Sequence, residues 1–406
     1  MVPNGWKIHS ISDIAEVKGG KRLPKGYTLQ PEPNGHPYIR VTDMFDGGVS
    51  LDSIQYVPEE AVNAISRYKI STSDIFITVA GTLGIVGIIS EQLDGANLTE
   101  NADKLTNLKI DQRFLLEMLR SPIVQSHIEA EKTTNAQPKL ALTRIKGFKI
   151  PVPPIPEQRK IAKILSIWDK AIHTTERLIN NSKQQKKALM QQLLTGKKRL
   201  LDDSGKPFEG EWEEITLEKL AKYRRGSFPQ PYGNPEWVDE VNGYPFIQVY
   251  DIDKNMKLKP DTKIKISDAA IGKSVFIPKE TVIVSLQGSI GRVAITQYDA
   301  YVDRTVLLFQ EFIVPMDKVF FAFIIQELFE IEKTKAPGGT IKTITKEVLS
   351  NFKVHIPSIT EQQKIAFVLI NADQEIELLE QQLADLKQEK KALMQQLLTG
   401  KRRVAV

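Results

Sequence analysis

The chain of 406 residues contains no cysteine. This absence excludes disulfide bonds, thiolate catalysis and cysteine-ligated zinc or iron–sulfur centres, and it suits a reducing compartment such as the cytoplasm. Histidine is also scarce, and its positions lack the spacing of metal ligands: His9, His36, His127, His173 and His355. We therefore expect no metal site in this chain and a cytoplasmic location.

Long apolar runs are missing as well. No run approaches the ~18 residues of a membrane span, and the first residues lack a basic start followed by an apolar block, so we expect no secretion signal. Hydrophobic content of 41% and charged content of 26% are typical of a soluble globular protein. A chain of this length predicts two or three domains. The net charge of +5 permits a polyanionic partner without requiring one.

Motifs of catalysis and cofactor binding are not found. Gly81, Gly84 and Gly87 match neither a dinucleotide fingerprint nor a phosphate-binding loop. The segment NPEW at 234–237 resembles the Asn-Pro-Pro-aromatic element of amino-methyltransferases, but it lacks the second proline, and no glycine-rich cofactor loop precedes it. We interpret it as a turn. We also find no nuclease-like cluster of carboxylates with a lysine, and we expect a non-catalytic binding protein that holds no cofactor itself.

One string occurs twice. KKALMQQLLTGK stands at 186–197 and again at 390–401, a separation of 390 − 186 = 204 residues. At the same offset, FKIPVPPIPEQRKIA at 148–162 matches FKVHIPSITEQQKIA at 352–366. The match has no gap, which indicates a duplication.

Weaker matches continue upstream with small changes of offset. PYIRVTDM at 37–44 corresponds to PFIQVYDI at 245–252, and AGTLGIVG at 80–87 corresponds to QGSIGRVA at 287–294. The chain is therefore a tandem duplication in the order domain, helix, domain, helix. The predicted limits are 1–152 and 202–356 for the domains and 153–201 and 357–406 for the helices.

Each domain mixes strands and helices. Short β-branched runs predict strands at 75–81 and 281–288. Longer periodic segments predict helices at 111–131, restarted at the Ser-Pro of 121–122, and at 317–332. The fold class is therefore α+β.

Both helices carry an a/d heptad seam, with steps that alternate between four and three residues. The seam of the first helix consists of Ile161, Leu165, Trp168, Ile172, Thr175, Ile179, Ser182, Lys186, Leu189 and Leu193. The seam of the second consists of Ile365, Leu369, Ala372, Ile376, Leu379, Leu383, Leu386, Lys390, Leu393 and Leu397. A helix of ~40 residues is roughly 60 Å long and needs a partner. The duplicate helix carries the chain back, so we predict a long antiparallel two-helix coiled coil with pseudo-two-fold symmetry, separating the two domains.

The helix ends and the two seam lysines give finer predictions. Thr360 with Gln363 predicts a capping box, and Gly196 and Gly400 predict left-handed helix ends. Lys186 and Lys390 occupy equivalent seam positions. They would either fix the register as buried polar residues or extend to the solvent at the rim, which is the commoner outcome for lysine.

Two inverted domains on a stiff spacer suit duplex DNA, where paired readers bind half-sites about 34 Å apart. Equivalent loops in both domains are basic and polar, and they differ from each other. The large matched aromatic residues Trp6, Trp168, Trp212, Phe148 and Phe352 are expected in cores instead. The candidate DNA-binding residues are Lys18, Lys21, Arg22, Lys25, Tyr27, Arg40, Thr42, Thr82, Asn135, Gln137, Lys139, Tyr223, Arg224, Arg225, Gln230, Tyr232, Gln248, Tyr250, Gln287, Ser289, Arg292, Thr340 and Lys342. For any one of them, a solvated surface residue is an equally good interpretation.

The PPIPEQ motif at 153–158, the KKALMQQLLTGK strings and the order of the parts resemble the specificity subunit of type I DNA restriction–modification enzymes. The resemblance covers essentially the whole chain; the second copy departs from the family's motif at the entry to its helix, where Pro-Ser at 357–358 replaces the double proline. It implies that each domain is a target-recognition domain that reads a few base pairs of double-stranded DNA. It also implies that the helices dock two methyltransferase subunits, which carry S-adenosylmethionine and methylate adenine N6, and that a restriction subunit joins through them.

Two other interpretations stay open. The chain could be a coiled-coil scaffold that bridges two partners without DNA readout, or an adenine methyltransferase in its own right. The missing cofactor motif argues against the methyltransferase, and the salt dependence of binding separates a DNA reader from a scaffold. The sequence predicts neither the bases recognised nor the spacer length in base pairs.

Overall fold

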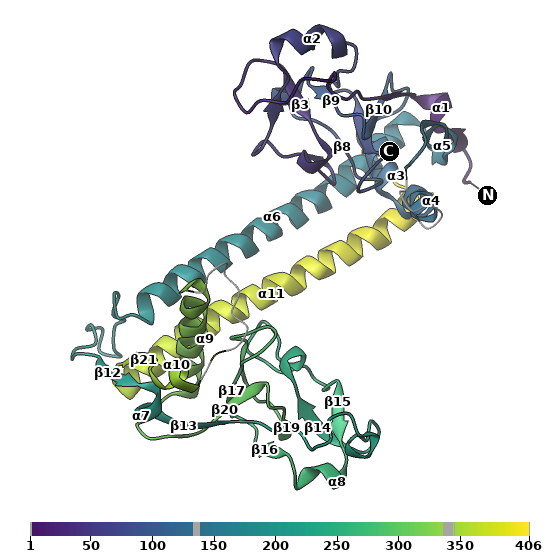
Figure 1. Ribbon diagram of the computed structural model, residues 1–406. Helices are drawn as coiled ribbons and strands as arrows, with labels where there is room; N and C mark the ends of the chain where they lie inside the picture. Colours follow the sequence, from purple (N-terminus) through teal and green to yellow (C-terminus); the bar gives the residue numbers. More distant parts are fainter. Residues whose placement is uncertain (1, 133–138, 336–343, 345, 406) are drawn as a thin grey trace. The chain divides into compact units, whose positions relative to one another are not determined.

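The computed structural model describes residues 2–132, 139–335, 344 and 346–405 (Figure 1). The chain forms two compact units: 1–176 with 381–406, and 177–380. The division falls inside the two long helices, α6 (Ile155–Leu193) and α11 (Ile359–Leu397), so each unit holds half of each helix. Every helix of the described residues is too short or too polar to cross a membrane. The predicted domain limits divide the chain by sequence order, and they stay a prediction.

The first unit is built around a four-stranded antiparallel sheet in the order β2-β10-β7-β8. A second sheet, β6-β3-β9, contains a parallel pair, while β1 pairs with β11 and β4 with β5. The strands are β1 (Lys7–Ser10), β2 (Glu16–Gly19), β3 (Pro37–Ile39), β4 (Met44–Phe45), β5 (Gly48–Val49), β6 (Gln55–Tyr56), β7 (Ile75–Thr78), β8 (Val86–Gly87), β9 (Asn97–Leu98), β10 (Ala102–Thr106) and β11 (Lys149–Val152). The helices are α1 (Ile11–Ile14), η1 (Val41–Asp43), α2 (Glu59–Ile65), η2 (Glu91–Leu93), α3 (Gln112–Arg120), α4 (Pro122–Lys132) and α5 (Leu142–Gly147).

The second unit repeats this plan. Its main sheet has the order β13-β20-β17-β18, its second sheet the order β15-β14-β19-β16, and β12 pairs with β21. The strands are β12 (Glu213–Thr216), β13 (Ala221–Arg225), β14 (Tyr244–Ile247), β15 (Ile264–Ile266), β16 (Val275–Ile277), β17 (Val282–Ser285), β18 (Val293–Ile295), β19 (Ala300–Val302), β20 (Val306–Phe312) and β21 (Lys353–Ile356). The helices are α7 (Leu217–Leu220), η3 (Pro235–Trp237), η4 (Val249–Asp251), α8 (Asp268–Ile271), α9 (Lys318–Lys335) and α10 (Lys346–Ser350).

These elements confirm the α+β prediction. The strands expected at 75–81 and 281–288 are β7 and β17, and the helix expected at 317–332 is α9. The helix at 111–131 is interrupted as predicted, because α3 ends at Arg120 and α4 starts at Pro122.

The helix pairs are antiparallel in both units. In the first unit, Asp169 bonds Lys390 at 2.7 Å and Glu176 bonds Lys387 at 2.8 Å, so residue numbers rise along α6 as they fall along α11. Unit two has the same order, shown by Lys186 with Asp373 at 2.5 Å and Lys183 with Glu380 at 2.6 Å. All the seam positions named above are buried or half-buried. The predicted antiparallel coiled coil is confirmed.

Each core combines a globular domain with both helices. Trp6 and Phe148 lie in the first core, and Phe352 lies in the second, as expected for matched aromatic residues. Trp212 packs against the second core while half-buried, and Trp168 is half-buried on the seam.

The start of α11 corrects one prediction. The helix begins at Ile359, so Ser358 precedes its first turn, and the Ser358 hydroxyl accepts a hydrogen bond from the Glu361 amide at 3.4 Å. Thr360 therefore lies inside the first turn and does not cap it, because the serine two residues earlier already supplies the acceptor. The predicted helix ends are confirmed by the positive φ of Gly196 (69°) and Gly400 (72°).

The rim interpretation of the seam lysines is wrong. Lys390 is 6% exposed, and its Nζ lies 2.7 Å from Asp169 and 2.9 Å from Glu117. The Nζ of Lys186 bonds Asp373 and lies 5.1 Å from the ring centre of Phe323. Both lysines stay inside because an aspartate of the opposite helix, at equivalent positions, offers each a charged partner. A buried charge without that partner would be costly.

We predict that Lys390→Met destabilises the first unit by roughly 2–4 kcal/mol, because it removes one of the two cations beside Asp169 and Glu117 and leaves Arg120 alone to balance both carboxylates. Lys186→Met is the matched control. It should cost less, since the side chain of Asp373 is 40% exposed and can be hydrated. Thermal unfolding of both variants measures the difference; equal losses would contradict the argument.

Candidate nucleic-acid interface

In the first unit, two of the predicted loops leave from one end of the four-stranded sheet. Strands β2 and β7 both run antiparallel to β10, so their C-terminal ends lie where β10 begins. The basic loop after β2 and the β7–β8 turn that carries Thr82 therefore begin on either side of the start of β10.

Backbone hydrogen bonds bring the other loops to the same end. The Lys21 amide donates to Leu98 at 2.8 Å, and the Thr99 amide donates to Ile39, the residue before Arg40, at 3.2 Å. Leu140, which follows Lys139, donates to the carbonyl of Val79 at 2.9 Å. The Val79 amide in turn donates to Asn101 at 2.8 Å, so the segment 98–101 is the common anchor of the candidate loops.

A close backbone approach fixes the basic loop on this anchor. A Cβ placed on Gly20 would lie 2.0 Å from the carbonyl oxygen of Thr99, so only glycine fits there. In the second unit, a Cβ on Gly226 would lie 2.2 Å from the carbonyl oxygen of Val302. The equivalent contact confirms that the two loops correspond.

The second unit gathers its loops in the same way. The Ser227 amide donates to Val302 at 2.9 Å and the Asp303 amide to Ile247 at 3.0 Å, while Leu286 donates to Thr305 at 2.8 Å. Candidate residues after β13, after β14 and in the β17–β18 turn therefore meet around 302–305.

In the first unit, most candidate side chains are exposed, and several form an ion pair with an acidic side chain. Arg22 bonds Glu100 at 2.7 Å and Lys18 bonds Glu16 at 2.7 Å. Arg40 differs, because its guanidinium bonds Asp43 at 2.6 Å and the carbonyl of Ser53 at 2.6 Å, which braces the loop. The exposed candidates are Lys18, Lys21, Arg22, Lys25, Tyr27, Thr42, Thr82 and Lys139.

In the second unit, three candidates are wholly or partly buried. Gln248 is 8% exposed and hydrogen-bonded to the hydroxyl of Tyr250. Burial, followed by the nearby charge of Asp251, raises the pKa of Tyr250 to about 12. Tyr223 is half-buried, with its ring 5.9 Å from that of Phe309. The exposed candidates are Arg224, Arg225, Gln230, Tyr232, Gln287, Ser289 and Arg292.

Four further candidates lie outside the described residues: Asn135, Gln137, Thr340 and Lys342. The NPEW segment is confirmed as a turn, η3, in which the Asn234 side chain accepts from the Glu236 amide at 3.1 Å and Trp237 is buried. Within the ranges that the structure describes, no group of three or more His, Asp or Glu side chains could hold a metal ion.

Sequence reasoning missed Arg304. It is exposed beside the anchor of the second unit, and its guanidinium lies 5.8 Å from the ring centre of Tyr232. Its counterpart in the first unit, 204 residues earlier, is Glu100. The offset changes from 207 to 204 between the matched strings on either side of Glu100, so the correspondence becomes clear only from the equivalent bonds of Gly20 to Ala102 and of Gly226 to Val306.

Comparisons with known proteins identify the family of this chain. Residues 3–183 and 209–388 match the family described as the type I restriction modification DNA specificity domain. The chain belongs to this family. It is therefore a DNA specificity subunit, the recognition component of a restriction–modification enzyme and not its catalytic part, as the resemblance predicted.

Individual relatives support the same assignment. The chain is 28% identical over 426 residues to a putative type I restriction enzyme MjaX specificity subunit of Methanocaldococcus jannaschii, with 99% of this chain and 95% of that protein covered. It is 27% identical over 199 residues to the EcoBI specificity subunit of Escherichia coli, covering 48% of this chain and 41% of that protein. Among solved structures, the S subunit of M. genitalium shares the fold with a TM-score of 0.57 at 18% identity, and 98% of both chains is covered.

Asp103 is a buried carboxyl beside the first anchor, and it provides a pH test of this surface. Burial raises its pKa to about 6, although Lys139 acts in the opposite direction. The folded state therefore binds the proton more tightly, so Asp103 lowers stability as pH rises from 3.8 through about 6.

We predict that Asp103→Asn stabilises the protein at pH 7.5 relative to wild type by up to about 3 kcal/mol, and that the gain vanishes near pH 4. Urea unfolding at both pH values measures it. The exposed Asp52→Asn is the control. An Asp103→Asn effect that does not change with pH would contradict the buried charge.

Proposed function

We propose that the two units read the two halves of a split, asymmetric DNA sequence, one half-site each. The supporting observation is that equivalent loops are anchored at the same end of equivalent sheets and carry different side chains. Backbone anchoring would place both loop sets in matching positions, while base contacts depend on the side chains. Glu100 against Arg304, at equivalent places beside the two anchors, is such a difference.

We further propose that the helices dock two adenine-N6 methyltransferase subunits, through which a restriction subunit joins. Those partners would carry S-adenosylmethionine. The repeated string supports two like docking surfaces, because it exposes the same side chains in both units: Lys187 and Lys391, Gln191 and Gln395, and Gln192 and Gln396. A solved structure that shares the fold, with a TM-score of 0.61 at 16% identity and 98% of both chains covered, comes from a study of complex assembly in a type I R-M system.

Co-expression of the chain with its methyltransferase partner, followed by mapping of modified adenines across a genome, tests this function directly. It should return one bipartite sequence with an adenine modified on each strand. Methylation by the purified chain alone would instead support a methyltransferase.

Salt separates a DNA reader from a scaffold. We predict that the affinity of the complex for its duplex falls about 10³-fold or more between 50 and 200 mM salt, if six or more phosphates are neutralised. Fluorescence anisotropy with a labelled duplex measures the slope. A flat response would favour a scaffold that ignores DNA.

Domain exchange tests the division of labour. Replacing 1–149 with the same part of another specificity subunit should change one half of the modified sequence and leave the other half and the gap unchanged. The matched exchange of 202–353 should change only the other half. A change in both halves from either exchange would contradict independent reading.

A further inference from the structure

The candidate loop with Arg40 and Thr42 continues directly into the β4–β5 hairpin. The carbonyl of Asp43 accepts a hydrogen bond from the Ser50 amide at 2.8 Å, which ties the loop to the hairpin. The Gly47 amide donates to Val86, at the start of β8, at 2.8 Å. The hairpin is thus bonded to the loop at one end and to the main sheet at the other.

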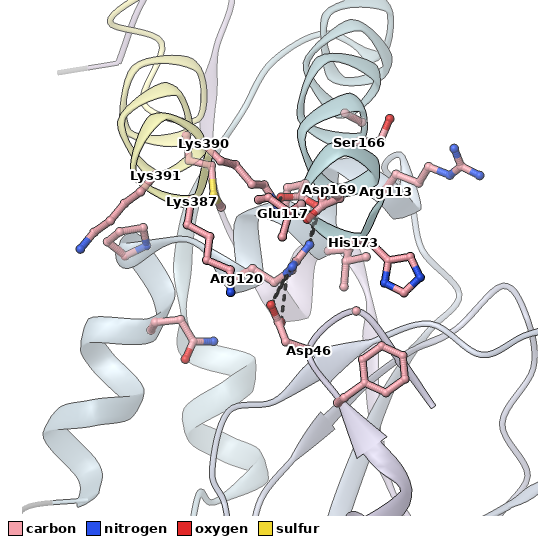
Figure 2. Close-up of a pocket in the computed structure, with 18 of the residues that line it drawn as sticks. Asp46, Arg113, Glu117, Arg120, Ser166, Asp169, His173, Lys387, Lys390 and Lys391 are labelled. Atoms are coloured by element: carbon pink, nitrogen blue, oxygen red, sulfur yellow. Dashed lines mark hydrogen bonds and ion pairs between the residues drawn. The ribbon is translucent and has the colours of Figure 1, made fainter. Parts of the chain in front are cut away.

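Asp46 lies at the turn of this hairpin and is held by Arg120, the last residue of α3. The Arg120 Nε lies 3.0 Å from both Asp46 oxygens, and Nη2 lies 2.6 Å from one of them (Figure 2). Two parallel N–H to oxygen bonds of this kind fix both distance and orientation. The turn can therefore move little while the pair is intact.

The same guanidinium reaches the helix pair. Its Nη1 donates to Glu117 at 2.9 Å and to Asp169 of α6 at 3.2 Å, and Lys390 of α11 bonds Asp169 at 2.7 Å. Figure 2 shows these side chains converging from α3, α6, α11 and the hairpin. The Arg120 side chain is 15% exposed, so salt screens this link less than a surface pair.

The second unit also links its loop to the helices, but with other residues. The counterparts of Glu117 and Arg120, 206 residues later, are Phe323 and Gln326. There Lys257, in the loop after η4, lies 3.0 Å from Glu377 of α11, and Lys254 lies 3.5 Å from Glu380. The residues differ and the charges are reversed, so inheritance from one ancestral segment does not account for both links. A requirement shared by both units, that the loop be fixed on the helix pair, does account for both links.

We propose that Arg120 is a positioning residue for recognition of the first half-site: it holds the loop with Arg40 and Thr42 at a fixed place on the helix pair through Asp46. This rests on the proposed function. Hydrogen bonds to base edges depend steeply on distance and angle, whereas attraction to phosphates does not. Loss of the link should therefore reduce discrimination between base pairs more than it reduces overall affinity.

The test compares Asp46→Ala and Arg120→Gln with the matched double variant of the second unit, Lys254→Gln with Lys257→Gln. Each is assembled with the methyltransferase partner. Dissociation constants are measured at one salt concentration for the cognate duplex and for duplexes with one base pair changed in either half-site. Asp46→Ala is the principal variant, because the Asp46 side chain is 59% exposed and its removal leaves Arg120 bonded to Glu117 and Asp169.

We expect Asp46→Ala and Arg120→Gln to lower discrimination at the first half-site about tenfold and to leave the second within twofold. The lysine variant should do the reverse. Combining Asp46→Ala with Arg120→Gln should add nothing, since either change breaks the same link. Amide hydrogen exchange of 40–50 should accelerate in both single variants.

An equal loss at both half-sites, or a loss of affinity with discrimination unchanged, would overturn the positioning role and leave DNA reading intact. If the wild-type complex fails to distinguish the duplexes at all, the proposed function itself fails, and the inference falls with it.

Discussion

Each globular core is completed by the end of a helix that begins in the other half of the sequence. In the first unit, the end of α11 packs in one cluster with the start of α6. This cluster contains Met394, Leu397 and Leu398 on one side and Ile161 and Leu165 on the other. In the second, the end of α6 packs with the start of α11 in the same way. Neither domain closes its core from its own contiguous segment, so the antiparallel helix pair is part of each core.

Charged groups at the helix ends fix this closure. Glu157 is buried and receives two hydrogen bonds from Arg403, at 2.7 and 2.8 Å, and Glu361 receives two from Arg199, at 2.6 and 2.7 Å. The side chain of Gln158 accepts a hydrogen bond from the amide of Asp111, just before α3. The side chain of Gln362 accepts one from the amide of Asp317, just before α9. The Glu-Gln of the PPIPEQ motif therefore has a physical role. It joins the start of α6 to the segment after α11 through Arg403, and to the start of α3 through Asp111.

The sequence was sufficient for features that are long, periodic or repeated. The 204-residue offset and the heptad steps predicted two domains, two helices and their antiparallel pairing, all of which the structure contains. The fate of Lys390 was not predictable in this way, because its partner Asp169 lies on the other helix and Glu117 on α3. Arg40 was recognisable as a basic residue of a candidate loop, but its brace to Asp43 depends on a turn that no periodic pattern reveals. Sequence reasoning failed for the partners of single side chains, which neither the heptad pattern nor the repeat identifies.

The two units differ mainly in loop side chains whose exchange leaves the loop backbone in place. The candidate loops are anchored by backbone amides and carbonyls around 98–101 and 302–305, and such bonds do not depend on side-chain identity. The exceptions are Gly20 and Gly226, where any Cβ would collide with the anchor. Side chains such as Glu100 and Arg304 can therefore be exchanged while the loop stays in place. This separation of backbone position from side-chain identity would let one scaffold acquire new DNA preferences without a new fold.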